Sequence, residues 1–250
     1  MAYEGETPER IPHPPVRIDL GCGTKALPGF VGVDHSPLPG VDVVADLERP
    51  LPVADSCADL VHASHSLEHV RNLVPVMEEI WRICRPGAQV AIVAPYGQQG
   101  LNLANPFHHE IFNEHSPRFW TDAGTCTVDA AEWYRPPHGT IWGLSTSEHT
   151  RPRLDLRLVR MEFLYFDRYR NFPPWLQRKM RLGHLDVCDQ VIYHLVAVKP
   201  PMTDEDVQRV AATMDPYVPA WIEPRRGRRA ETFRDRVGRC FRQLAAMLHP

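Results

Sequence analysis

The sequence lacks the features that would place it in a membrane, among secreted proteins or on nucleic acid. No run of 18 apolar residues occurs, so no segment is long enough for a spanning helix. The polar, proline-rich start, MAYEGETPERIPHPP, has no apolar core of a signal peptide. The formal net charge is −3, so no overall field favours nucleic acid or an anionic membrane. We therefore expect a cytoplasmic protein without membrane contact, for which nucleic acid is a poor partner.

The chain also lacks an ordered cysteine pattern and internal repeats. Its six cysteines are scattered at positions 22, 57, 84, 126, 188 and 240, with no C-x-x-C motif among them. Such spacing indicates reduced thiols and excludes a zinc ribbon or a disulfide framework. A length of 250 residues then suits one α/β domain with elaborations.

What the sequence does contain is a series of short apolar segments. They carry β-branched residues and are bounded by turn formers, as expected for strands buried on both faces of a parallel sheet. The predicted strands are residues 16–20, 30–34, 42–45, 58–63 and 88–94, followed by two more near 154–166 and 190–198. Apolar residues at helical spacing predict one helix over roughly 68–84.

The first two strands end in residues suited to a nucleoside. The motif DLGCG at 19–23 follows the first strand, and Asp34 closes the second. Two glycines one residue apart allow a tight turn and the close approach of a ligand. A carboxylate at the tip of the neighbouring strand can accept hydrogen bonds from the two hydroxyls of a ribose.

Three interpretations of this turn compete. It could be a chance glycine turn, because a lone G-x-G is weak evidence. It could be a dinucleotide site, since Gly21, Gly23 and Ala26 fit G-x-G-x-x-G/A. That motif requires a full helix and an acid roughly 20 residues on, whereas Pro28-Gly29 interrupts the short interval before Asp34. S-adenosylmethionine carries a ribose but no phosphate, tolerates a stunted helix, and fits best.

Downstream motifs favour the third interpretation. LEH at 67–69 follows the fourth strand, and RPG at 85–87 precedes the fifth. In order and spacing, these segments resemble the class I S-adenosylmethionine-dependent methyltransferases, closest to the small-molecule branch with DLGCG, LEH and RPG motifs, over about residues 14–120. Two departures are Lys25, which stands near the family's common third glycine, and the abbreviated first helix. The resemblance implies a seven-stranded, mostly parallel Rossmann-like sheet with an antiparallel last strand, a lid insertion and C-terminal helices.

The resemblance also implies which positions bind the cofactor, S-adenosyl-L-methionine. They are Asp19, Gly21, Cys22 and Gly23 for its amino-acid part, Asp34 and His35 for the ribose, Asp46 and Leu47 for the adenine, and Ser64 and His65 for the methionine part and the transferred methyl.

Histidines supply the candidates for a catalytic base. Residues 97–150 are too long for a simple connection and are typical of a lid. Within them His108 and His109 could accept a proton from a substrate, although each could equally be a hydrogen-bonded lid residue. His69 is expected to line the pocket. His65 and His69 could share a helix face, but no third ligand completes the site, so no metal is expected.

The remaining expectations concern organisation and partners. We expect a short extension at 1–15, a methyltransferase domain at 16–200 with lid insertions at 97–150 and 167–188, and a C-terminal helical appendage at 201–250. An amphipathic helix near 230–248 must pack against the domain or against a second copy in a homodimer.

The aromatic, histidine-rich lid favours a small organic substrate, methylated on oxygen or nitrogen, as in specialised metabolism. Two alternatives stay open. One is an RNA or protein methyltransferase recruited through the basic stretch between Arg225 and Arg242. The other is a relative that binds S-adenosylmethionine without catalysis.

Overall fold

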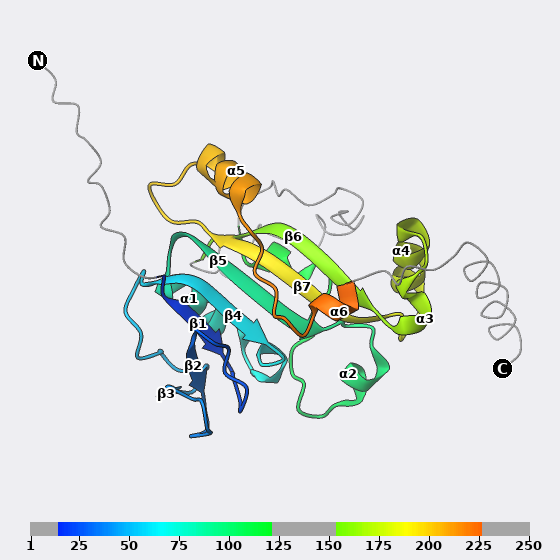
Figure 1. Cartoon of the computed structure of the whole chain (residues 1–250), viewed down its shortest axis with the longest axis horizontal. Coiled ribbons are helices and arrows are strands. Elements are labelled where there is room, and N and C mark those ends of the chain that lie inside the picture. The colour runs from blue at the N-terminus through cyan, green and yellow to red at the C-terminus, as the bar shows by residue number, and fades with distance from the viewer. Residues whose placement is uncertain (1–14, 122–153, 227–250) are drawn as a thin grey trace, which may run out of the picture.

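A computed structural model describes residues 15–121 and 154–226. Seven strands form one sheet in the order β3-β2-β1-β4-β5-β7-β6 (Figure 1). The strands are β1 (Arg17–Leu20), β2 (Val31–Asp34), β3 (Val43–Val44), β4 (Ala58–Ser64), β5 (Cys84–Pro95), β6 (Leu156–Tyr165) and β7 (Cys188–Ala197). The first five strands pair in parallel, and β7 runs antiparallel to both β5 and β6. The predicted fold class is confirmed.

Short helices connect and cover the strands. They are η1 (Leu67–His69), α1 (Leu73–Ile83), α2 (Gly100–Ala104), η2 (Ser116–Phe119), α3 (Asp167–Arg170), α4 (Pro174–Gly183), α5 (Asp204–Thr213) and α6 (Glu223–Arg226). None of the described helices has the length and apolar character needed to cross a membrane.

The predicted helix over 68–84 is in fact two helices. The chain is extended at Val70 and Asn72, between η1 and α1. Pro75 explains the division, because proline lacks an N–H group and is tolerated only in the first turn of a helix. A helix is also missing between Gly23 and Phe30, where the described backbone forms turns.

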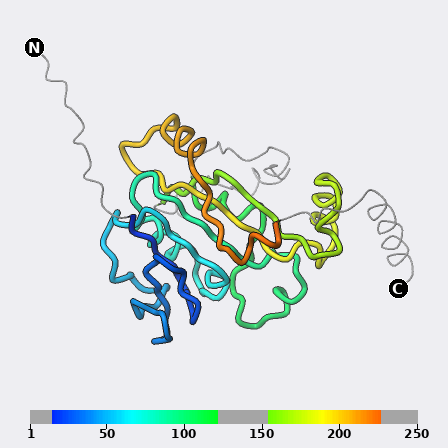
Figure 2. The backbone as a smooth tube through the Cα atoms, viewed as in Figure 1, coloured from blue at the N-terminus to red at the C-terminus, as the bar shows by residue number. Residues whose placement is uncertain are grey.

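The two faces of the sheet are covered differently. On one face, α1 packs Val76, Met77 and Ile80 into the main core. The opposite face is covered by the chain after α5, which returns across the sheet to α6 (Figure 2). Val218 and Ile222 of that segment pack in a cluster with strand residues of β5, β6 and β7.

Ion pairs hold the end of this returning segment. Arg226 donates from Nε to Glu162 of β6 at 2.8 Å, and the buried His194 of β7 lies 3.2 Å from the same carboxylate. Burial alone would raise the pKa of Glu162, but these hydrogen bonds and the charge of Arg160 lower it to about 2. Residues 201–226 thus cover the sheet directly. The predicted helix at 230–248, with its homodimer interface, lies outside the described residues.

The two predicted lid insertions contact each other where they are described. The amide of Gly100 donates to Asp186 Oδ1 at 2.7 Å, and the amide of Asp186 donates to the carbonyl of Gln98 at 3.1 Å. These bonds join the two segments just after the end of β5. Residues 122–150 of the lid lie outside the described part of the chain.

Candidate functional site

The glycine turn lies against the end of β4. Gly21 has a φ of +68°, and a Cβ at this position would lie 2.3 Å from Cβ of Ser66. Ser66 donates its hydroxyl to the carbonyl of Leu20 at 3.0 Å. Gly23 also has a positive φ, of +55°, but no described atom lies within 4 Å of its would-be Cβ. Gly21 thus permits close packing of the turn, whereas Gly23 borders open space.

Asp34 organises the turn from the tip of β2. Its side chain is buried, and its two oxygens accept the amides of Gly23 at 2.9 Å and Ser36 at 3.0 Å. An ionised carboxylate has about four acceptor positions. Oδ2 therefore retains capacity for one further donor, such as a ribose hydroxyl. Oδ1 also lies 3.1 Å from Nδ1 of His35, whose side chain is 81% exposed and can turn away when a ligand binds.

Asp19 takes part in a buried pair that the sequence did not reveal. It faces His62 on the neighbouring strand β4, and the two side chains meet at 2.7 Å. Phe30 and Tyr217 both lie edge-on to the His62 ring and are tilted against each other. This arrangement holds the end of β1 against β4. It occupies Oδ1 of Asp19, so that among the described residues only Oδ2 is left for a ligand.

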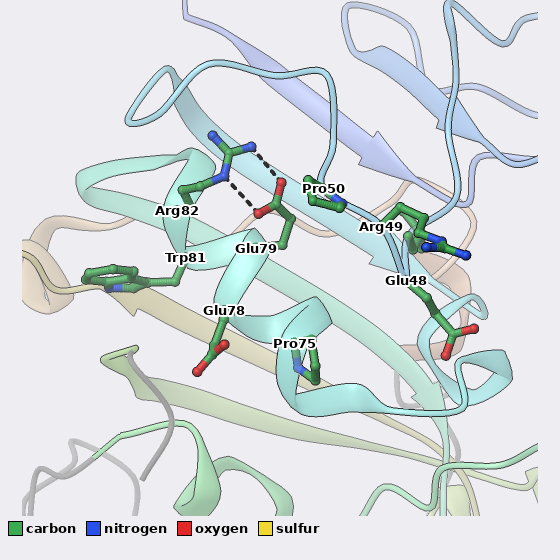
Figure 3. Close-up of a pocket in the computed structure, with 9 residues that line it drawn as sticks. Glu48, Arg49, Pro50, Pro75, Glu78, Glu79, Trp81 and Arg82 are labelled. Carbon is green, nitrogen blue, oxygen red and sulfur yellow. Dashed lines mark hydrogen bonds and ion pairs between the residues drawn. The ribbon is translucent and has the colours of Figure 1, made fainter.

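The predicted adenine residues follow β3 on a loop attached to α1. Asp46 is exposed and accepts the amide of Glu48 at 2.9 Å, while Leu47 packs against the core. Beside Leu47 lies a pocket of about 350 Å³ (Figure 3). In it Arg82 pairs with Glu79, and both bind the backbone of the loop at Leu51. The pocket's polar groups thus hold the loop in place.

The end of β4 carries the residues predicted to lie near the methionine part of the cofactor and the transferred methyl group. Ser64 is the last residue of β4, and His65 follows it with a φ of +52°. The His65 ring lies 3.4 Å from the buried Glu68 and 6.2 Å, between ring centroids, from Trp221 of the returning segment.

The chain after α2, within the predicted lid, folds back onto η1 and brings two of the histidines together. The carbonyl of Glu68 accepts the amides of His109 at 2.8 Å and Glu110 at 3.2 Å. As a result, the rings of His69 and His108 lie 4.7 Å apart between centroids, while His109 is exposed. Burial lowers the pKa of His108, so its imidazole is neutral near pH 7. The structure thus places two of the three predicted catalytic histidines in contact.

Cys22 is an unreactive member of the turn. Burial, followed by the charges of Asp19 and Asp34, raises the pKa of its thiol to about 11. A neutral thiol at this position packs against the turn and does not act as a nucleophile.

A buried ion pair under the lid was also missed by sequence reasoning. Arg181 of α4 is buried, lies 3.1 Å from Glu114, and stacks 3.5 Å from the ring centroid of Phe163. Glu114 accepts the hydroxyl of Tyr96 at 2.8 Å. The periodicity of α4 carries no sign of this, because the partners come from three distant segments.

Comparison with known proteins bears on part of this arrangement. Residues 18–92, from β1 through most of β5, match the family model of a methyltransferase domain. The match supports the resemblance to S-adenosylmethionine-dependent methyltransferases over this part of the chain, and that resemblance implies S-adenosyl-L-methionine as the cofactor. No curated protein matches the sequence.

Several solved structures are similar to the chain. One is described as an S-adenosyl-L-methionine-dependent methyltransferase of Methanococcus maripaludis, with 20% identity over 31% of this chain and 47% of the other, at a TM-score of 0.27. A methyltransferase of Aquifex aeolicus has 14% identity over 73% of this chain and 82% of the other, at a TM-score of 0.39. Phosphoethanolamine N-methyltransferase 2 of Haemonchus contortus has 12% identity over 76% of this chain and 50% of the other, at a TM-score of 0.39. The chain spans about half the length of the first and third relatives.

The residues of the turn suit this cofactor. The open space beside Gly23 admits a ligand, and Asp34 retains acceptor positions at the carboxyl edge of the sheet. The ordering of the strands reverses between β1 and β4, which is where open α/β sheets bind ligands. S-adenosylmethionine supplies a methyl group activated by its own sulfonium charge. The protein has to orient an acceptor and exclude water.

Proposed function

We propose that the protein is an S-adenosyl-L-methionine-dependent methyltransferase that transfers the methyl group to an oxygen or nitrogen atom of a small organic molecule. The observation that carries the proposal is the contact between the lid and η1. Hydrogen bonds from His109 and Glu110 to Glu68 hold the predicted lid against η1, next to the end of β4 with Ser64 and His65. His65, His69 and His109 are exposed at this edge, so an acceptor bound there meets imidazole side chains, which suits a small molecule with a polar group.

In this proposal the two sides of the site have separate tasks. The turn and the tips of β2 and β3 bind the cofactor, with Asp34 accepting the ribose hydroxyls. His69, His108 and His109 lie on the acceptor side and orient the nucleophile. Ser64 and His65 stand between the two sides, at the end of the central strand β4.

The start of the basic C-terminal stretch supports a small acceptor over RNA. Arg225 pairs with Asp189, and Arg226 pairs with Glu162. Arginines held by carboxylates on the sheet have less capacity to neutralise phosphates.

The acceptor class is tested by measuring S-adenosylhomocysteine release from a panel of small phenols, hydroxy acids and amines. Total RNA and unfolded protein serve as competing acceptors. We expect turnover with members of the small-molecule panel, and no methyl label in either polymer. Methyl label in RNA or protein would overturn the proposal, as would cofactor binding without turnover on any acceptor class.

The ribose assignment is tested by Asp34→Ala. Two hydrogen bonds to a charged carboxylate contribute about 1.5–3 kcal/mol each, or about 3–6 kcal/mol together. The affinity for S-adenosylhomocysteine, measured by calorimetry, should fall about 10²–10⁴-fold. Asp42→Ala is the matched control, because Asp42 also accepts a backbone amide, of Gly32 at 2.8 Å, within the same region. If Asp34→Ala and Asp42→Ala lost the same affinity for S-adenosylhomocysteine, Asp34 would stabilise the loop only and would not bind the ribose.

A further inference from the structure

Three side chains from two separate segments meet beside the end of β4. Glu68 and His69 belong to η1, and His108 belongs to the lid. One ligand atom from each of the three lies within 4.8 Å of the other two. Ligand atoms of a tetrahedral ion at about 2.0–2.2 Å lie about 3.4 Å apart, so the bound ion would draw them together by up to about 1.4 Å. The sequence led us to expect no metal here, because the contact of His108 with η1 depends on how the chain after α2 folds back.

Both imidazole rings are held in the tautomer that a metal requires. Nδ1 of His69 lies 3.1 Å from the carbonyl of Phe107, which can only accept. Nδ1 of His108 lies 2.6 Å from Oδ1 of Asn102. The amide of Asn102 donates through Nδ2 to the carbonyl of Tyr96 at 3.3 Å, so its oxygen faces His108. Nδ1 therefore carries the proton in each ring, and each Nε2 offers a lone pair. Metal-ligating histidines show this pattern of outer hydrogen bonds.

Among the described residues, no lysine or arginine pairs with the carboxylate of the cluster. Glu68 is 1% exposed, and its Oε2 has no hydrogen-bond partner within the described residues. Its Oε1 lies 3.4 Å from Nδ1 of His65. A buried carboxylate without a cationic partner is costly. A divalent cation would supply the charge that the described neighbours do not.

We propose that Glu68, His69 and His108 bind a divalent transition metal ion of the zinc type. Two imidazoles and one carboxylate are a recurrent ligand set for Zn²⁺ in sites that keep open positions. Imidazole ligands disfavour Mg²⁺ and Ca²⁺, which take oxygen ligands. The open positions would bind an oxygen atom of the acceptor, which narrows the substrate to hydroxyl- or carboxylate-bearing molecules. This role rests on the proposed function, whereas binding of the ion does not.

The direct test uses the full chain stripped of metal by a chelator. Zn²⁺ is titrated in competition with a zinc-binding dye, and Co²⁺ is added separately to record its visible absorption spectrum. We expect one equivalent of Zn²⁺ to bind, and Co²⁺ to give a spectrum that excess Zn²⁺ removes. The absence of saturable one-equivalent binding would overturn the proposal.

Variants locate the ion. His69→Ala and Glu68→Gln should each weaken Zn²⁺ binding at least about 100-fold, whereas Asn102→Leu, which keeps all three ligands, should weaken it about 10–100-fold. His184→Ala is the control, because His184 is exposed at the end of α4 and should leave affinity unchanged. Unaltered affinity in His69→Ala and Glu68→Gln would refute the site.

Binding of S-adenosylhomocysteine to the same samples separates the two proposals. It also reports folding, since a variant that retains it has an intact sheet. If the unsubstituted chain bound the nucleoside but no Zn²⁺, only the metal site would be refuted. Zn²⁺ binding without turnover on any acceptor would refute the proposed function and leave the metal site standing.

Discussion

Gly21 and Gly23 share a backbone conformation but differ in their surroundings, and this difference predicts distinct effects for the same substitution. Both have a positive φ, so alanine at either position incurs about 1–2 kcal/mol of left-handed strain. At Gly21 the new Cβ would also meet Ser66 Cβ at 2.3 Å. Overpacking of this kind costs about 1–3 kcal/mol. We expect Gly21→Ala to lower the free energy of unfolding by about 2–5 kcal/mol, and Gly23→Ala by about 1–2 kcal/mol.

Ligand affinity should rank the two variants in the opposite order: relative to the stability that it loses, Gly23→Ala should lose more affinity than Gly21→Ala. Gly23 borders the open space beside the turn, so its added methyl would stand where the cofactor approaches. Urea unfolding measures the stability of each variant, and calorimetry with S-adenosylhomocysteine measures its affinity. We expect Gly23→Ala to lose affinity with little loss of stability, whereas Gly21→Ala loses stability first.

A second substitution isolates the clash. Ser66→Gly removes the Cβ that Gly21→Ala would strike, at the cost of one hydrogen bond to Leu20, about 0.5–1.5 kcal/mol. The double variant should therefore be destabilised by less than the sum of the two single variants. Equal unfolding energies for Gly21→Ala and Gly23→Ala, together with strict additivity in the double variant, would refute this account of the turn.

Two further predictions concern buried charges away from the turn. Arg181→Met leaves the buried Glu114 without its cation and should lower the free energy of unfolding by about 3–5 kcal/mol, against at most about 1 kcal/mol for Arg209→Met, whose pair is on the surface. The pKa of Glu162 is about 2 in the folded protein and about 4.3 in the unfolded chain, a difference that contributes about 3 kcal/mol to the free energy of unfolding. This contribution is fully present when the pH is above the unfolded pKa, and it is lost as the pH falls toward 2. In urea unfolding, Glu162→Gln should therefore be destabilising at pH 7 and nearly neutral near pH 2, and an effect independent of pH would contradict the assignment.

The sheet was predictable because its signal is local. Apolar segments bounded by glycine, proline and aspartate marked β1, β2 and β4 to within a residue or two. The prediction of one helix over 68–84 was wrong, because Pro75 requires a separate helix to begin at Leu73 and the apolar spacing does not reveal this. The absence of a helix after Gly23 agrees with the expectation of an abbreviated one.

The site was predictable only at the strand ends. The glycines follow β1 and Asp34 ends β2, so the parallel pairing of the two strands alone brings them together. The contact of His108 with His69 depends on where a lid of irregular structure folds back, and no periodicity records that. The same holds for Asn102, whose role follows from a rotamer and two hydrogen bonds.

The missing first helix and the returning C-terminal segment belong to one arrangement. Without a helix after Gly23, the sheet face that carries Asp19 and His62 needs another cover, and Tyr217 supplies part of it against His62 and Phe30. The exchange has an electrostatic consequence for the ligand. A helix N-terminus would attract phosphate, whereas in this turn the amides of Gly21 and Cys22 are bound to the carbonyl of Val33 and that of Gly23 to Asp34. Carboxylates without a helix dipole disfavour a pyrophosphate and suit a nucleoside whose sulfonium is positively charged.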